Sequence, residues 1–115
     1  MKLAIIGSRT FNNYTLLCAV VRTYFKDLSI QEVISGGAAG ADSLGARYAK
    51  DNNLQLREFI PDWEKYGKSA GFIRNEDIVK NADFVLCFWD GVSRGTQNSL
   101  GHAKKMKKPT LIIYF

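Results

Sequence analysis

The stretch Glu32–Asp42 reads EVISGGAAGAD and predicts a change of secondary structure at its centre. Its first four residues have the pattern of a short buried strand, and helical spacing of apolar residues begins after Gly40 with Ala41, Leu44 and Tyr48. Between this predicted strand and this predicted helix, glycines and alanines leave the backbone without bulky side chains. This favours either a tight strand-to-helix turn or the close approach of another group.

The same pattern of a strand followed by a helix recurs along the whole chain. Short apolar runs alternate with segments whose apolar residues have helical spacing. The runs predict five strands, at Lys2–Ile6, Glu32–Ser35, Leu54–Ile60, Asp83–Trp89 and Thr110–Phe115. The intervening helical patterns cover residues 17–28, 41–49, 70–81 and 95–107, and a loop is expected between Pro61 and Ala70. Such alternation predicts a parallel sheet with helices on both faces. Right-handed crossovers favour a three-layer, doubly wound α/β fold. Among the strand orders open to such a fold, we expect 3-2-1-4-5.

Length and composition narrow the classes of protein. The 115 residues suit one domain, residues 1–115. No apolar run approaches the ~20 residues of a membrane helix, and the N-terminal apolar stretch is too short for a secretory signal. We therefore expect a cytoplasmic protein without a membrane partner. Cys18 and Cys87 lie in apolar patterns, and His102 is the single histidine, so we expect no metal site.

The net charge of +5 has two interpretations. The run KKMKK at Lys104–Lys108 closes the last predicted helix, where cations offset the helix dipole. A basic surface can also attract polyanions. Because the other basic residues are spread along the sequence, we favour the first interpretation and do not expect nucleic acid as a partner.

Glycine-rich segments follow the predicted strands. In a doubly wound sheet the carboxyl ends of the strands share one edge, and ligands bind in the crevice there. The turn after the second strand and SRGT (Ser93–Thr96) before the last helix combine exposed amides with a helix start, an arrangement that holds anions such as phosphate. We expect the amides of Gly37 and Gly40 to face such an anion.

Several side chains near these turns are candidates for the same site. Arg9 and Arg74 would supply positive charge, and Trp63 would stack on a base. Asp42 could either favour the start of its helix or bond ribose hydroxyls. The full set expected to bind a ligand is Gly7, Ser8, Arg9, Ser35, Gly36, Gly37, Gly40, Asp42, Trp63, Arg74, Asn75, Asp90, Gly91, Gly95 and Thr96.

Four motifs together resemble one superfamily: IIGSRTF at Ile5–Phe11, ISGGAAGAD at Ile34–Asp42, PDWEKYGKSAGFIRN at Pro61–Asn75 and FWDGVSRGT at Phe88–Thr96. They are similar to the SLOG superfamily, which contains the Lonely Guy phosphoribohydrolases and the DNA-processing protein A family, and most similar to its single-domain YspA-like branch. The resemblance runs from Leu3 to about Ala103. It implies a Rossmann-like fold, a nucleotide or ADP-ribose-like ligand without a further cofactor, and phosphate-binding turns at Gly36, Gly37 and Gly40 and at Gly95 and Thr96.

The chain departs from the Lonely Guy pattern at the catalytic position. Those enzymes carry P-G-G-x-G-T-x-x-E, whereas here Asp90 stands at the start of the motif and Ser99 stands where the Glu would fall. Their Arg-Lys pair appears as Arg74-Asn75. The candidates for catalytic residues are thus Arg74, Asp42 and Asp90, with Glu76 and Asp77 as further acids.

Three functions stay open. A sensing or sequestering module for a nucleotide comes first, because the Glu is missing. A nucleotide N-glycosidase with a displaced acid and a nucleic-acid-binding protein are the alternatives. A homodimer is also open, since relatives often form dimers.

Overall fold

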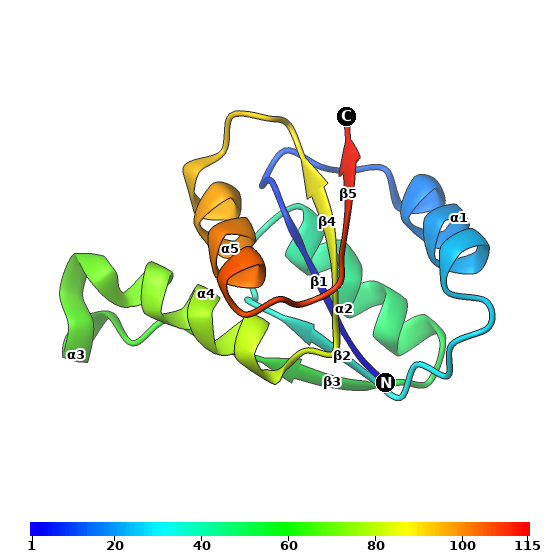
Figure 1. Ribbon diagram of the computed structural model, residues 1–115, viewed down its shortest axis with the longest axis horizontal. Coiled ribbons are helices and arrows are strands. Elements are labelled where there is room, and N and C mark those ends of the chain that lie inside the picture. Colours follow the sequence, from blue (N-terminus) through cyan, green and yellow to red (C-terminus); the bar gives the residue numbers. More distant parts are fainter.

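The computed structural model describes residues 1–115, and helices and strands alternate along the chain (Figure 1). The elements are β1 (Lys2–Gly7), α1 (Tyr14–Tyr24), β2 (Glu32–Ser35), α2 (Ala41–Asp51), β3 (Gln55–Glu58), α3 (Trp63–Tyr66), the 3-10 helix η1 (Gly67–Ser69), α4 (Ala70–Asn81), β4 (Phe84–Trp89), α5 (Arg94–Lys105) and β5 (Thr110–Tyr114). None of the helices has both the length and the apolar character needed to cross a bilayer.

All five strands form one parallel sheet in the order β3-β2-β1-β4-β5, which confirms the predicted order. β1 and β4 lie side by side at its centre and stay in register to their ends, where Gly7 is opposite Phe88. The chain changes direction across the sheet between β1 and β4. The carboxyl ends of these two strands therefore border the crevice in which ligands of such folds bind.

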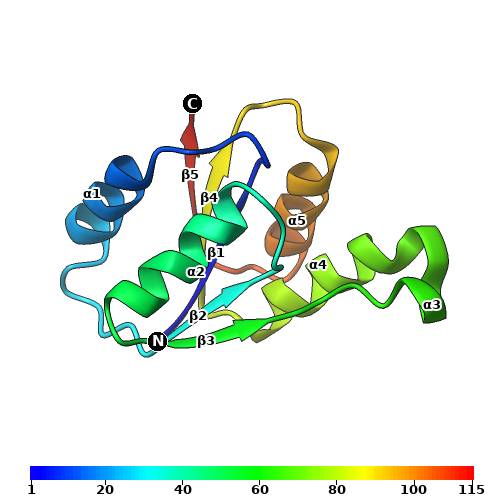
Figure 2. The same cartoon turned by 180° about the vertical axis from the view of Figure 1, so that it is seen from behind.

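Two apolar cores cover the two faces of the sheet, because side chains of a strand point alternately to opposite faces. Leu3 and Ile5 of β1 pack with α1 and α2 in one core. Ala4 and Ile6 pack with α4 and α5 in the other. Figure 2 shows α1 and α2 on the near side of the sheet. The three-layer prediction is confirmed, and each layer of helices delivers one helix start to the β1–β4 crevice.

The first helix is shorter than its apolar spacing predicts. Asn13 caps it, its side chain accepting a hydrogen bond from the Leu16 amide at 2.9 Å. The helix ends at Tyr24, so Leu28 lies in the following loop and is 45% exposed. The buried side chains Leu17, Val20 and Val21 already fill the core face.

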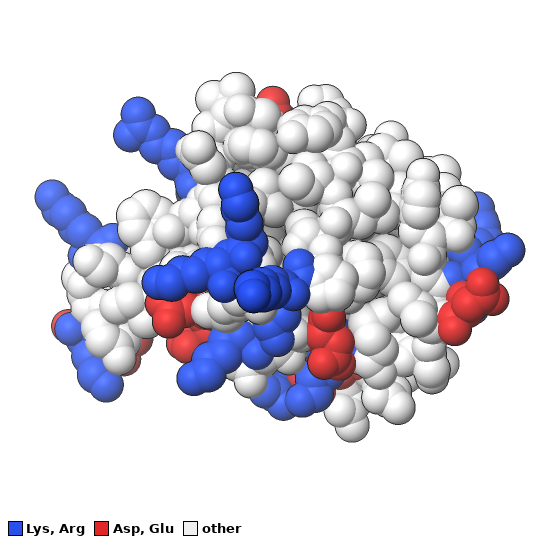
Figure 3. All heavy atoms as spheres, in the orientation of Figure 1, with Lys and Arg blue, Asp and Glu red and all other residues white.

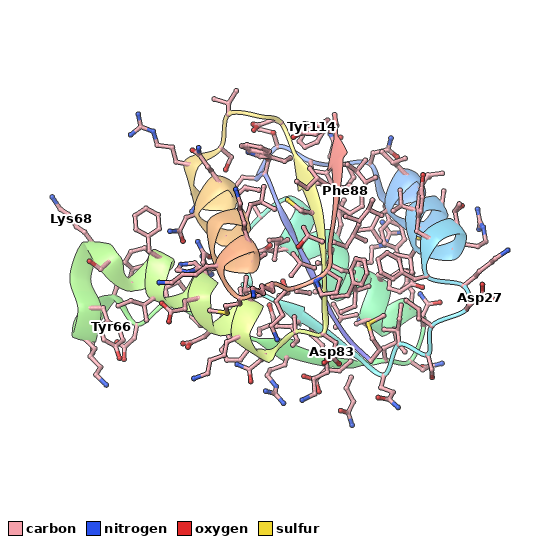
Figure 4. The ribbon with its side chains drawn as sticks, in the orientation of Figure 1. Asp27, Tyr66, Lys68, Asp83, Phe88 and Tyr114 are labelled. Carbon is pink, nitrogen blue, oxygen red and sulfur yellow. The ribbon has the colours of Figure 1, made fainter.

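The segment after Pro61 is ordered as helix rather than as the predicted loop. The Asp62 side chain accepts a hydrogen bond from the Lys65 amide at 3.1 Å and starts α3. η1 then leads directly into α4. α3 projects away from the sheet, and the labelled side chains of Tyr66 and Lys68 mark this far end of the molecule (Figure 4).

Candidate functional site

Ser8 joins three of the loops at the carboxyl edge of the sheet. Its amide donates to the Phe88 carbonyl at 2.8 Å, and its hydroxyl accepts from the Asp90 amide at 3.1 Å. Its carbonyl accepts from the Ala41 amide at 3.2 Å, at the start of α2. Ser8 is 1% exposed, so this residue holds the loops together from inside and does not face a ligand.

The small residues of the turn after β2 are explained by close packing within the protein. At Gly40, which has φ +77°, a Cβ would lie 2.4 Å from the carbonyl oxygens of both Ser8 and Arg9. At Gly36 a Cβ would lie 2.7 Å from both Arg74 Nη1 and Asp42 Oδ2. The bare backbone therefore lets the β1 loop and two charged side chains approach the turn.

Two amides of this turn, those of Ala38 and Gly37, already have partners within the chain, which corrects the expectation that the Gly37 amide faces an external anion. The Ala38 amide donates to Asp42 Oδ2 at 3.2 Å, and the Gly37 amide donates weakly to Ser35 Oγ at 3.4 Å. Ser35 in turn donates to the Asp42 carbonyl at 3.1 Å. The chain's own carboxylate thus takes the Ala38 amide, between the two glycines at which a phosphate was expected.

Asp42 is a buried carboxyl group whose pKa is shifted toward neutrality. The side chain is 7% exposed, and burial raises its pKa from 3.8 to about 6. The Ala38 amide, the charge of Arg74 and the Gly36 amide oppose the rise, whereas the negative charge of Glu58 adds to it. Asp42 therefore changes its charge just below physiological pH.

Arg74 reaches across from α4 to the same turn. Its Nη1 donates to the Gly36 carbonyl, and its Nε donates to Asn75 Oδ1 at 3.0 Å. Partial burial lowers the pKa of the guanidinium, the charge of Asp42 raises it, and the charge of Arg9 lowers it. Arg9 and Arg74 thus lie near enough to repel one another, and an anion between them would relieve that repulsion.

These groups border a cavity of about 90 Å³ between α4, α5, the end of β1 and the turn that leads from β2 into α2. Asn75 closes one side, since its amide nitrogen donates to the Gly95 carbonyl and to Asn98 Oδ1, both at 3.2 Å. The wall consists of Ile6, Gly7, Arg9, Ala38, Asp42, Arg74, Asn75, Ile78, Ser93, Gly95, Thr96 and Ser99. Only three of these twelve residues are hydrophobic, so the cavity suits a polar group.

The start of α5 forms one end of this wall. Ser93 caps the helix: its hydroxyl accepts from the Thr96 amide at 3.4 Å and lies 3.1 Å from Thr96 Oγ1. The amides of Arg94 and Gly95 donate to no backbone carbonyl, and a Cβ at Gly95 would meet open space. Gly95 lines the cavity, so the first turn keeps an unpaired amide and the positive end of the helix dipole there.

The structure divides the predicted site residues into two groups. Those in the cavity wall are Gly7, Arg9, Asp42, Arg74, Asn75, Gly95 and Thr96. Those outside it are Ser8, Ser35, Gly36, Gly37, Gly40, Trp63, Asp90 and Gly91. Wall residues absent from the prediction are Ile6, Ala38, Ile78, Ser93 and Ser99. Ser93 has a sequence signal, because Ser directly before the first residue of a helix is a typical N-cap.

Asp90 serves the loop and not the cavity, which corrects its place among the catalytic candidates. Its Oδ1 accepts hydrogen bonds from the amides of Val92 and Ser93, both at 2.8 Å. These bonds hold its pKa below the ordinary value, Ser93 contributing most. Asp90 and Gly91 are exposed and shape the turn that leads into α5.

Trp63 lies outside the cavity wall but beside the helix that forms it. Its side chain is 57% exposed, and a Cβ at Gly71 would lie 3.7 Å from the indole. Gly71 precedes Asn75 by four residues, so the two positions share one face of α4. Trp63 is thus about one helical turn from the cavity.

No cluster of three or more His, Cys, Asp or Glu side chains is placed to hold a metal ion.

Comparison with known proteins identifies the family and agrees with the fold. The family described as YspA, cpYpsA-related SLOG matches residues 1–66. The Gene 61 protein of Mycobacterium phage D29 is 36% identical over 85 residues, covering 69% of this chain and 68% of the phage protein. The solved structure of DNA processing protein A from Helicobacter pylori superposes with a TM-score of 0.74 at 19% identity, covering 97% of this chain. The superposition covers 64% of that protein's chain, and the low identity supports likeness of fold alone.

The Helicobacter pylori protein binds single-stranded DNA. The expectation that nucleic acid is no partner, which rested on the scattered basic residues, is therefore wrong. A protein with this fold binds single-stranded DNA. The strand order, the helices on both faces, the four motifs and the matched relatives lead to the same assignment. The chain belongs to the YspA, cpYpsA-related SLOG family.

Proposed function

We propose that the protein binds a small nucleotide or nucleotide-derived ligand, with a phosphate group in the cavity between Arg9, Arg74 and the first turn of α5. The meeting of two guanidinium groups with an unpaired helix-start amide carries this proposal. The hydroxyls of Ser93 and Thr96 add further polar groups at the same end of the cavity. Charge-assisted hydrogen bonds of this kind are the strong ones in phosphate recognition.

The size of the cavity limits what it encloses. Its volume of about 90 Å³ is well below the roughly 300–1,000 Å³ of pockets that enclose a drug-sized ligand. It suits a phosphate or sugar-phosphate group, and the remainder of a nucleotide would lie outside. Trp63, one turn along α4, offers an exposed indole on which the base can stack.

Thermal shift with a panel of nucleotides and ADP-ribose tests the proposal, and Arg9 is the informative position. Arg9 is exposed and forms no ion pair, so Arg9→Ala removes charge from the cavity without breaking an internal contact. A ligand at a hundredfold excess over Kd adds about 2.7 kcal/mol, which raises Tm by several degrees. We expect Arg9→Ala to lose most of this shift. Arg22→Ala, at an exposed position on α1, is the control and keeps it.

No shift with any member of the panel would overturn the proposal, and so would an equal shift in wild type and Arg9→Ala. Arg74→Ala is less decisive, because Arg74 also supports the Gly36 turn. Its loss would combine an effect on binding with an effect on folding.

The N-glycosidase alternative is favoured by one observation, the presence of Asp42 in the cavity wall. Ser99, at the position of the missing Glu, also lines the cavity, so the wall there offers a hydroxyl where the relatives have a carboxylate. A carboxyl group with a pKa of about 6 can stabilise an oxocarbenium-like centre or activate water. Release of free base that disappears in Asp42→Asn would place this activity first; binding without release supports the sensing module.

The nucleic-acid alternative is favoured by the surface as well as by the structural relative. Figure 3 shows Lys and Arg side chains gathered over α4 and α5, with carboxylates between them. The basic residues of these helices and of the following turn include Lys80, Arg94, Lys104, Lys105 and Lys107. A strand whose backbone phosphate entered the cavity would continue along this face.

A further inference from the structure

A second hollow lies on the opposite face of the sheet, between the carboxyl ends of α1 and α2. Its volume is about 500 Å³, within the range of pockets that bind small molecules. The lining consists of Cys18, Val21, Arg22, Phe25, Lys26, Leu28, Ile30, Tyr48, Asn52 and Leu54. Helices α1 and α2 end at the amino edge of the strands, so this groove is distant from the anion cavity at their carboxyl edge.

The floor of the groove is apolar and well supported. Val21 and Phe25 are each 3% exposed, and the Phe25 ring packs edge-on against Phe84 with centroids 4.8 Å apart. Leu28, on the other hand, is 45% exposed at the rim. Leu28, Ile30 and Leu54 leave apolar surface of the lining in water, so a ligand that covered them would gain from removing that surface from water.

The rim carries positive charge without a partner. Arg22 and Lys26 are both exposed, and neither takes part in the ion pairs of the chain, which join Arg47 to Asp51 and Arg57 to Glu32. Asp27 follows Lys26 in the sequence but is absent from the lining and lies at the outer edge of the molecule (Figure 4). Arg22 also offsets the dipole at the end of α1.

Tyr48 adds a hydrogen-bond donor to the groove. Burial raises the pKa of its hydroxyl, with a further contribution from Cys18, so the hydroxyl stays protonated at neutral pH. The groove thus combines an apolar floor, a neutral donor and two cations at the rim, and no carboxylate lines it.

We infer that this groove binds a free organic monocarboxylate with a flexible apolar tail, the tail lying over Val21, Phe25 and Leu54 and the carboxylate at Arg22 and Lys26. Charge complementarity selects an anion, and the floor selects the apolar body. The site is independent of the proposed nucleotide site, since the two share no residue.

Titration of the full chain with decanoate, below its micellar concentration and followed by amide NMR, tests this inference. We expect shifts at Val21, Phe25 and Leu54 and none at Gly95 or Thr96. The uncharged analogue decanol should bind about tenfold or more weakly, as expected for loss of a charge-assisted contact. The double variant Arg22→Glu with Lys26→Glu should weaken decanoate binding to at least the same degree, whereas Lys104→Glu with Lys105→Glu, on α5, should leave it unchanged.

Several outcomes would overturn the inference. They are the absence of decanoate binding, equal affinity for decanol, and equal affinity in the Arg22 and Lys26 charge-reversal variant. Co-sedimentation with phosphatidylglycerol vesicles at concentrations where decanoate has no effect would show that the groove binds a membrane surface instead. The protein could instead form a dimer at high concentration that shifts the amides of Val21, Phe25 and Leu54 and that decanoate does not dissociate. That result would show that a second copy of the chain covers the groove.

Discussion

At the scale of single residues, Asp42 makes a prediction about pH. Its pKa is raised in the folded protein to about 6, so the folded state binds the proton more tightly than the unfolded state. The free energy of unfolding should therefore fall as pH rises from about 3 to about 7, by roughly 3 kcal/mol for a shift of this size. Above that range the full cost of the buried charge is present.

Urea denaturation of wild type and Asp42→Asn across this pH range measures the effect. The amide of the variant does not titrate, so its stability should change much less between about pH 3 and about pH 7. An identical pH dependence in both proteins would show that Asp42 does not titrate as its burial implies. Protonation of Asp42 thus links the stability of the turn between β2 and α2 to the charge of the cavity.

At the scale of elements, the turn between β2 and α2 depends on Gly40. Its φ of +77° and its contact with the Ser8 and Arg9 carbonyls leave no room for a side chain. We expect Gly40→Ala to destabilise the protein by about 2 kcal/mol or more, through backbone strain and displacement of the β1 loop. Gly101→Ala, in the exposed middle of α5 where a Cβ meets nothing, should instead stabilise by about 1 kcal/mol. Thermal unfolding of both variants makes the comparison, and equal Tm changes would contradict the packing explanation.

At the scale of the whole molecule, the distribution of charge separates the two ligand classes. If single-stranded nucleic acid binds along α4 and α5, its affinity should fall steeply with salt, with a slope reduced by about 0.7 for each phosphate contact removed. Fluorescence anisotropy of a labelled oligothymidine with Lys104→Gln and Lys105→Gln measures this slope. The matched control is Lys26→Gln with Lys50→Gln, which should leave the slope at its wild-type value. If the α5 variant leaves the salt dependence of the affinity unchanged, the surface of α4 and α5 does not bind the oligonucleotide. Binding of a nucleotide without steep salt dependence would favour the small-ligand proposal.

Local patterns in the sequence were sufficient for the architecture. Apolar runs such as Phe84–Trp89, bounded by turn residues and separated by helical spacing, depend on near neighbours in the chain, and each strand and helix must bury its apolar face. Right-handed crossovers favoured a doubly wound sheet without fixing its strand order, and four motifs in order indicated the family. The convergence of Arg9, Arg74 and Thr96 on one cavity was likewise predictable, because they follow strand ends or begin helices that share one edge of the sheet.

The roles of individual residues at the carboxyl edge of the sheet were decided by the tertiary structure. The sequence shows that Glu32–Asp42 is rich in glycine, but not that Asp42 fills the turn, that Ser8 anchors three loops, or that Gly40 meets the β1 carbonyls. The Ser8 and Gly40 contacts join segments about thirty or more residues apart, which no local pattern records. The bond between Asp42 and the Ala38 amide joins residues four apart, but it depends on the conformation of the folded turn, which buries the Asp42 side chain. For the same reason burial, a property of the folded whole, set the pKa of Asp42 near 6 and made it the distinctive acid of the cavity.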